Sequence, residues 1–112
     1  MVVDQLSDAE VDRLFHALAD ATRRDIVRRT LTEEASVSVL AAAYDMSFAA
    51  VQKHVALLEE VGLVSKHRKG RERLVRAEPD RIASARTLLA QLEEMWRARF
   101  SQLDDVLAET KE

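Results

Sequence analysis

The sequence predicts a mainly α-helical domain with one small β-hairpin, and three observations support this fold class. The 112-residue chain contains only two glycines and one proline, so few positions favour loops. A capping residue or proline precedes stretches in which apolar residues recur at intervals of three and four, the spacing of one helix face. Residues 63–77 instead alternate around a glycine, as paired strands do. With 47% apolar and 33% charged residues, the composition is that of an ordered, soluble chain.

The first helix is predicted from its start signal. Ser7 and Glu10 fit a capping box, in which each side chain binds a free backbone N–H group of the other residue. Apolar residues at helical spacing then continue the pattern to about Ala19: Val11, Leu14, Phe15 and Leu18.

The second helix follows immediately. Asp20 and Thr22 are both candidate caps for the stretch TRRDIVRRTL. Its apolar Ile26 and Val27 lie among arginines, so we expect one side of this helix to stay in contact with water.

Two further helices are separated by a very short turn. Ser36 can cap a short helix that ends near Ala43, and residues 44–46 make the turn. Ser47 caps the next helix, which Gly62 ends. Helices joined by so short a turn must cross steeply, so this segment is predicted to be a helix-turn-helix unit.

The second of these helices, about residues 47–61, has two distinct faces. Its inward face is predicted to consist of Val51, Val55 and Leu58. Its outward face carries small and polar side chains: Ala49, Gln52, Lys53 and Ala56. A helix of this size fits the DNA major groove, so this is the predicted recognition helix.

Several of its side chains have a chemistry that suits DNA. Gln52 can pair with adenine, and Lys53 can donate to guanine or to phosphate, although ordinary exposed polarity is the alternative for both. Small Ala49 permits close approach of the backbone, and Ser47 at the helix start can help to hold a phosphate. His54 borders the buried face, so local packing is the alternative to a contact with the DNA backbone.

The predicted hairpin is strongly basic although the chain has a net charge of −3 and a pI near 5.6. Its turn is Lys69-Gly70-Arg71, where glycine accepts a positive φ. Its cations are Lys66, Arg68, Lys69, Arg71, Arg73 and Arg76. Cations at a phosphate backbone release condensed counterions and so supply binding free energy that falls with salt. The alternative is a solvated edge hairpin, but the adjoining helix-turn-helix unit favours DNA contact.

The final helix, about residues 79–108, begins at Pro79 and is too long and too apolar for its own small domain to cover. With the first helix it is the predicted dimerisation surface: Leu14, Leu18, Leu89, Leu92, Trp96, Phe100, Leu103 and Leu107. For Leu14, Leu18 and Leu89, closure of the monomer core is an equally weighted alternative. A two-fold dimer would present its recognition helices to half-sites ~34 Å apart, which predicts an inverted-repeat operator.

The segments LFHALADATRRDIV and MSFAAVQKHVALLEEVGLVSKHRKGRERLVR, followed by Trp96, resemble the ArsR-type winged-helix repressors of bacteria and archaea. The resemblance covers residues 14–107 and implies a winged helix-turn-helix fold with N- and C-terminal dimerisation helices, a homodimer, and operator DNA as partner. The hairpin, about residues 63–77, is then the wing. The chain has Ala21 where many relatives have proline, and Phe48 where a polar or basic residue is common. The candidate DNA contacts are Ser47, Phe48, Ala49, Gln52, Lys53, His54, Lys66, Arg68, Lys69, Arg71 and Arg73.

The resemblance also raises the question of metal sensing, which the residues argue against. Members of the family sense metals through cysteines at the segment that reads SVSVLAAA here, or through Asp and His pairs on the last helix, which contains no histidine here. The chain has no cysteine, and its histidines lie on different predicted elements: His16, His54 and His67. The acidic end of the last helix is better explained as a solvated surface than as a cation site: Asp104, Asp105 and Glu109. We expect neither a metal nor a cofactor.

The sequence thus predicts one winged helix-turn-helix domain, residues 1–112, acting as a homodimeric repressor of promoters that include its own. No membrane-spanning run, signal peptide or catalytic constellation is recognisable, so we expect a cytoplasmic protein that is not an enzyme. The alternative is a winged-helix protein-interaction module without DNA binding, which would not need the basic hairpin. An unidentified small-molecule effector in a groove between the long helices also remains open.

Overall fold

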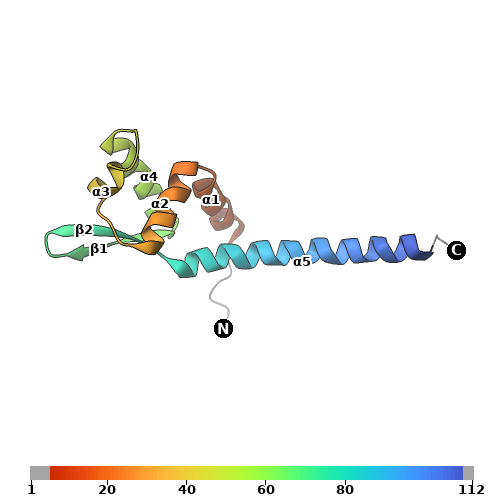
Figure 1. Cartoon of the computed structure of the whole chain (residues 1–112). Coiled ribbons are helices and arrows are strands. Elements are labelled where there is room, and N and C mark those ends of the chain that lie inside the picture. The colour runs from red at the N-terminus through yellow and green to blue at the C-terminus, as the bar shows by residue number, and fades with distance from the viewer. Residues whose placement is uncertain (1–5, 110–112) are drawn as a thin grey trace.

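The computed structural model describes residues 6–109 and confirms a mainly helical fold with one antiparallel hairpin. Figure 1 shows the helices packed around the base of the hairpin, and one long helix that leaves the domain on the other side. The elements in chain order are α1 (Asp8–Leu18), α2 (Ala21–Thr32), α3 (Val37–Ala41), α4 (Phe48–Glu60), β1 (Val64–Lys69), β2 (Glu72–Ala77) and α5 (Pro79–Glu109). In the part of the chain that the structure describes, no helix is long and apolar enough to cross a membrane.

The helices begin where local side-chain chemistry requires. Ser7 and Glu10 form the predicted capping box at the start of α1. Asp20, Ser36 and Ser47 each accept a hydrogen bond from the backbone N–H group three residues later, at the starts of α2, α3 and α4. Asp20, and not Thr22, is therefore the cap of α2. Each such cap typically stabilises its helix by about 1 kcal/mol.

A single hydrophobic core lies between α1, α2, α4 and the base of the hairpin. The fully buried large side chains are Leu14, Ile26, Val51, Val55, Leu58, Leu63, Val64 and Val75. Burying each of them stabilises the fold by about 1.5–3 kcal/mol relative to an exposed side chain. Thr30 is buried as well, and its hydroxyl donates to the carbonyl oxygen of Ile26 at 2.8 Å.

The hairpin pairs residues 64–69 with residues 72–77, from Val64 opposite Ala77 to Lys69 opposite Glu72. The turn contains Gly70 with a φ of 64°, in the left-handed region that glycine accepts at low cost. A short bridge between Ala35 and Val75 also ties the segment before α3 to β2. The bridge fixes the position of the hairpin relative to the helix-turn-helix unit.

The predicted dimerisation residues divide between the core and α5. Leu14 is only 1% exposed and belongs to the monomer core, so the prediction that it lies on a dimer surface is wrong for this protomer. Leu18 packs against the same core and is half-buried. The others on α5 are 47–58% exposed: Leu89, Leu92, Trp96, Phe100, Leu103 and Leu107.

The last turns of α5 project beyond the domain (Figure 1). The molecule is 73 Å long with a radius of gyration of 19.4 Å. A compact chain of this length would have a radius of gyration of about 13 Å. The molecule is elongated because α5, with its apolar stripe, extends beyond the other elements of the protomer.

Candidate nucleic-acid interface

Helix α4 presents the outward face that its sequence predicts. Val51, Val55 and Leu58 have no exposed surface and fix the rotation of α4 about its axis. The opposite face is exposed: Ala49, Gln52, Lys53 and Ala56. Phe48, the first residue of α4, is also 49% exposed. These side chains are therefore free, within the described protomer, to meet a partner.

Arg23 holds α4 against the first two helices. Its Nε donates to the carbonyl oxygen of Ala17 at 2.7 Å, at the end of α1. Its Nη1 lies 3.1 Å from Nδ1 of His54 on α4. His54 also lies 4.0 Å from the Asp20 carboxylate and is half-buried. The structure thus places His54 in a contact between α4 and α2, which is the packing alternative and not a position on the exposed face.

A second polar cluster anchors the turn of the helix-turn-helix unit. The hydroxyl of Tyr44 donates to Asp25 Oδ2 at 2.6 Å, and Arg29 Nε donates to the same oxygen at 2.7 Å. The Arg29 guanidinium also lies 5.5 Å from the centre of the Tyr44 ring, a cation–π contact. Arg28 completes the cluster, with Nη1 3.0 Å from Asp25 Oδ1.

This cluster changes the titration of its members. The hydrogen bonds from Tyr44 and Arg29 lower the pKa of Asp25, because they stabilise the carboxylate. Burial, followed by the bond to Asp25, raises the pKa of Tyr44 to about 12. Asp25 is therefore ionised, and Tyr44 neutral, at neutral pH.

The cations of the hairpin fall into two groups. Lys66 and Arg76 face carboxylates: Lys66 Nζ lies 3.9 Å from Glu59, and Arg76 Nη1 lies 3.5 Å from Glu34. Lys66 is only 19% exposed, and its ion pair ties β1 to α4. A contact with DNA, as predicted from the sequence, would require this side chain to extend outward. The cations nearer the tip are exposed: Arg68, Lys69, Arg71 and Arg73.

The exposed group, which we call the wing cations (Arg68, Lys69, Arg71 and Arg73), lacks neutralising partners. Within residues 6–109, no carboxylate oxygen lies within 4.0 Å of their charged nitrogens. The nearest polar contact is a weak one, from Arg68 Nε to the carbonyl oxygen of Gly70 at 3.4 Å. Figure 1 shows the hairpin projecting from the end of the molecule opposite to the C-terminal end of α5, the end where α3 and the start of α4 also lie.

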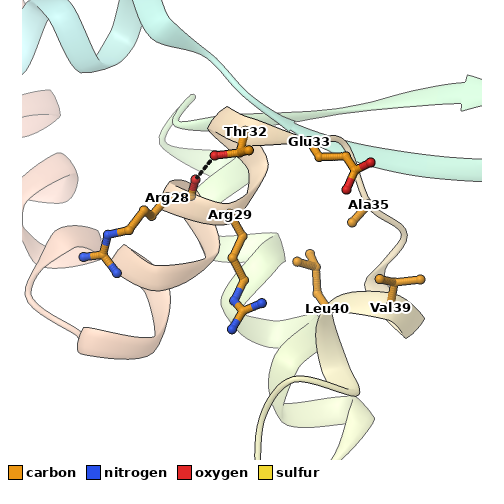
Figure 2. A pocket seen from close by; sticks show the side chains of 7 residues that line it. All are labelled: Arg28, Arg29, Thr32, Glu33, Ala35, Val39 and Leu40. Atoms are coloured by element: carbon orange, nitrogen blue, oxygen red, sulfur yellow. Dashed lines mark hydrogen bonds between the residues drawn. The ribbon is translucent and has the colours of Figure 1, made fainter.

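The end of α2 contributes to two pockets. One, of about 370 Å³, lies between the end of α2 and α3 (Figure 2). Its lining residues are Arg28, Arg29, Thr32, Glu33, Ala35, Val39 and Leu40. Both of its arginines already bind Asp25. A more apolar pocket of about 360 Å³ lies where α2 ends and α5 begins, and Leu31, Pro79, Asp80, Ile82, Ala83 and Arg86 line it. Among residues 6–109, no group of three or more His, Cys, Asp or Glu side chains is placed to hold a metal ion.

The residues that position α4 carry no clear signal in the sequence. Arg23, Asp25 and Tyr44 act across 31 and 19 residues of chain, so no local spacing marks them. The available signal was compositional: Tyr44 is the single tyrosine of the chain and it lies in a turn. A lone aromatic with a hydroxyl group in such a place usually packs its ring and finds a partner for its oxygen.

Comparison with known proteins defines the class. A family model described as a helix-turn-helix domain matches residues 18–67. The HTH-type transcriptional regulator Rv2034 of Mycobacterium tuberculosis is 35% identical over 85 residues, which cover 76% of this chain and 77% of the relative. An ArsR-like transcriptional regulator from Rhodococcus sp. RHA1 is 30% identical and superposes with a TM-score of 0.78, covering 88% of this chain and 92% of the other.

A homodimeric winged helix-turn-helix DNA-binding domain from Mycobacterium bovis has the same fold. It is 24% identical, has a TM-score of 0.63, and matches 84% of this chain and 92% of its own. Fold and sequence together define a winged helix-turn-helix regulator of transcription. The chain belongs to the ArsR-type family of these regulators.

Proposed function

We propose that the protein is a homodimeric repressor that binds an inverted-repeat operator in double-stranded DNA, including one in its own promoter. The observation that carries this proposal is the pairing of two exposed features. The outward face of α4 and the wing cations lie on the half of the molecule remote from the end of α5, and neither has a partner in the described protomer. Repression would follow from occlusion of the promoter.

The dimensions of α4 suit the major groove. Its 13 residues give an axial length of ~20 Å, and the groove admits a helix of this kind. Gln52 and Lys53 would face base edges or phosphates from the middle of the helix, and Ala49 and Ala56 would let the backbone approach. Ser47, at the start of α4, would lie beside a phosphate at the positive end of the helix dipole.

The wing cations would supply most of the non-specific affinity. Each phosphate contact releases condensed counterions, and this contribution falls as the salt concentration rises. The net charge of −3 does not oppose such binding, because the interaction is local and is screened over about 8–10 Å at ordinary ionic strength.

The exposed stripe of α5 supports the homodimer. Leu89, Leu92, Trp96, Phe100 and Leu103 recur at intervals of three and four along the projecting part of α5, and each is about half exposed. A stripe of this length exceeds the apolar patches that monomers normally leave in water. A second copy of α5 offers the same stripe and would cover it, as expected for a two-fold interface. The similar fold from Mycobacterium bovis is homodimeric.

Sedimentation tests the dimer. The wild-type protein is expected to be a dimer at micromolar concentration, and the double variant Trp96→Glu, Leu103→Glu a monomer, because two charges per helix would be buried in the interface. Gln91→Glu adds a charge to α5 outside the stripe and should leave the dimer intact. A monomeric wild-type protein at this concentration would contradict the proposal.

Selection of bound duplexes from a random DNA pool tests the complete proposal. We expect the purified protein to recover an inverted repeat whose half-sites are ~34 Å apart, and to bind the same sequence in its own promoter. Recovery of random sequences, or of none, would contradict the proposed function.

We also infer that transition metals are not the inducing signal, since the chain contains no cysteine. Added zinc should change the operator affinity by less than tenfold.

A further inference from the structure

Phe48 is an exposed aromatic residue that lies outside the apolar stripe of α5. It is the first residue of α4, directly after the Ser47 cap; 49% of its surface is exposed, and it is not among the residues that pack in the core. Its exposed neighbours in the chain include Met46, 36% exposed, and Ala49. A large apolar side chain is costly to hold in water, and nothing in the described protomer covers this one. Its position therefore suggests a surface that is covered only in a complex.

The chemistry of that surface follows from the place of Phe48 in the fold. In helix-turn-helix proteins the N-terminal residues of the recognition helix contact base edges in the major groove. A phenylalanine ring has no hydrogen-bonding group, so it cannot satisfy the N7, O6, N6 or N4 atoms of the other bases. The C5-methyl group of thymine is the apolar group that natural base pairs present there.

We propose that Phe48 reads thymine: its ring contacts the C5-methyl group of one thymine in each operator half-site. This inference rests on the proposed function and adds the identity of a base to it. Placing the ring against a cytosine or adenine amino group would instead remove water from a donor without replacing its hydrogen bond, which is unfavourable. Phe48 thus favours thymine by attraction and disfavours the other bases by desolvation.

Two local features make the contact feasible. Ala49 and Ala56 on the exposed face of α4 carry only methyl groups, so the helix can approach the base edges closely. The Tyr44–Asp25 hydrogen bond and the Ser47 cap fix the turn immediately before Phe48. The ring is therefore carried on a rigid helix start and not on a flexible loop, as a specificity-determining residue requires.

Replacement of single thymines by deoxyuridine in the selected operator tests the proposal, because this removes the methyl group and keeps the base pair. Burial of one methyl-sized group changes an equilibrium constant about fourfold near room temperature. For the wild-type protein we expect one position per half-site where the replacement weakens binding about fourfold, and on the order of tenfold when both half-sites are changed.

The same series with Phe48→Ala supplies the decisive comparison. This variant should bind the thymine operator more weakly, and its affinity should change by less than about twofold on replacement at the sensitive position. Phe48→Leu keeps an apolar side chain and should restore part of the sensitivity. Val39→Ala, an exposed apolar position on α3 that is 62% exposed, is the control and should retain the wild-type response.

The outcomes separate the two proposals. Binding of an inverted repeat with no thymine at a fixed position, or with equal deoxyuridine effects in wild type and Phe48→Ala, would overturn the reading of thymine and leave the repressor proposal intact. Failure of the wild-type protein to bind any duplex would overturn both. Circular dichroism and sedimentation of each variant would confirm that fold and dimer are preserved.

Discussion

Two arginine-rich regions of this protein, helix α2 and the hairpin, look alike in sequence and differ in what their charges contact. On α2, Arg23 and Arg24 donate to backbone carbonyls at the end of α1, and Arg28 and Arg29 bind Asp25. The wing cations meet no carboxylate within 4.0 Å among residues 6–109. The density of positive charge in a sequence therefore does not show which cations are paired within the fold and which remain available to a partner.

Geometry explains the difference. Asp25 lies three and four residues before Arg28 and Arg29, the spacing at which helical side chains meet. The carbonyls that end α1 form the negative end of a helix dipole, and the arginines at the start of α2 reach them. A hairpin tip has neither advantage, because its side chains diverge from a narrow turn into water. We therefore expect changes on α2 to alter stability, and changes at the wing to alter DNA binding.

Arg23→Ala should have the largest effect on stability. It removes the bonds to Ala17, His16 and His54 that join α1 to α4, and charged hydrogen bonds of this kind contribute about 1.5–3 kcal/mol. Urea denaturation at fixed protein concentration should show the free energy of unfolding lowered by about 3 kcal/mol. Arg86→Ala, an exposed arginine of α5, is the control and should change it by less than about 0.5 kcal/mol. Equal effects of the two changes would contradict a structural role for Arg23.

Tyr44→Phe should have a smaller effect. The variant loses the hydrogen bond to Asp25 and keeps the ring beneath Arg29, and the carboxylate retains both arginines. We expect a loss of about 1 kcal/mol in the same denaturation experiment. Because Tyr44 precedes the start of α4, operator affinity should fall as well, whereas its salt dependence should not change. A steeper or shallower salt dependence would place Tyr44 among the DNA contacts instead.

The loss of stability at acidic pH should depend on Asp25 and its hydrogen bonds to Tyr44 and Arg29. The pKa of Asp25 is lowered by its bonds to Tyr44 and Arg29, so the folded state binds this proton less readily than the unfolded chain does. The stabilisation is fully present above the ordinary carboxyl pKa of 3.8 and is lost as pH falls through the lower, folded-state pKa. Thermal unfolding of Asp25→Asn should therefore show a lower melting temperature at pH 7 and a smaller further decrease below pH 4 than wild type. Parallel pH profiles would exclude this role for Asp25.

Much of the fold could be predicted because its signals are local. The caps Ser7, Asp20, Ser36 and Ser47 each act within three residues, and Gly62 and Gly70 occupy turns that need positive φ. Leu14 shows where such reasoning stops. Its stripe looks like that of Leu89, yet Leu14 is buried and Leu89 is 52% exposed, and only the packing of α1 against α2 distinguishes them.

The candidate site shows the same division. The outward residues of α4 follow from helical periodicity, and the turn of the hairpin follows from Gly70. Lys66 and His54 are polar and lie next to those features, so the sequence alone favours them as DNA contacts. Their actual partners, Glu59 and Arg23, come from other elements, and only the tertiary structure brings them within reach.

The central claim is that the wing cations contact DNA phosphates. The salt dependence of operator binding by the double variant Arg71→Ala, Arg73→Ala tests it directly. Both residues are exposed and unpaired within the described chain, so the free energy of unfolding should change by less than about 0.5 kcal/mol. Affinity should fall for every duplex, and the slope of log affinity against log salt should become shallower by about one for each lost phosphate contact, or about four for a dimer. An unchanged slope together with unchanged affinity would contradict the account.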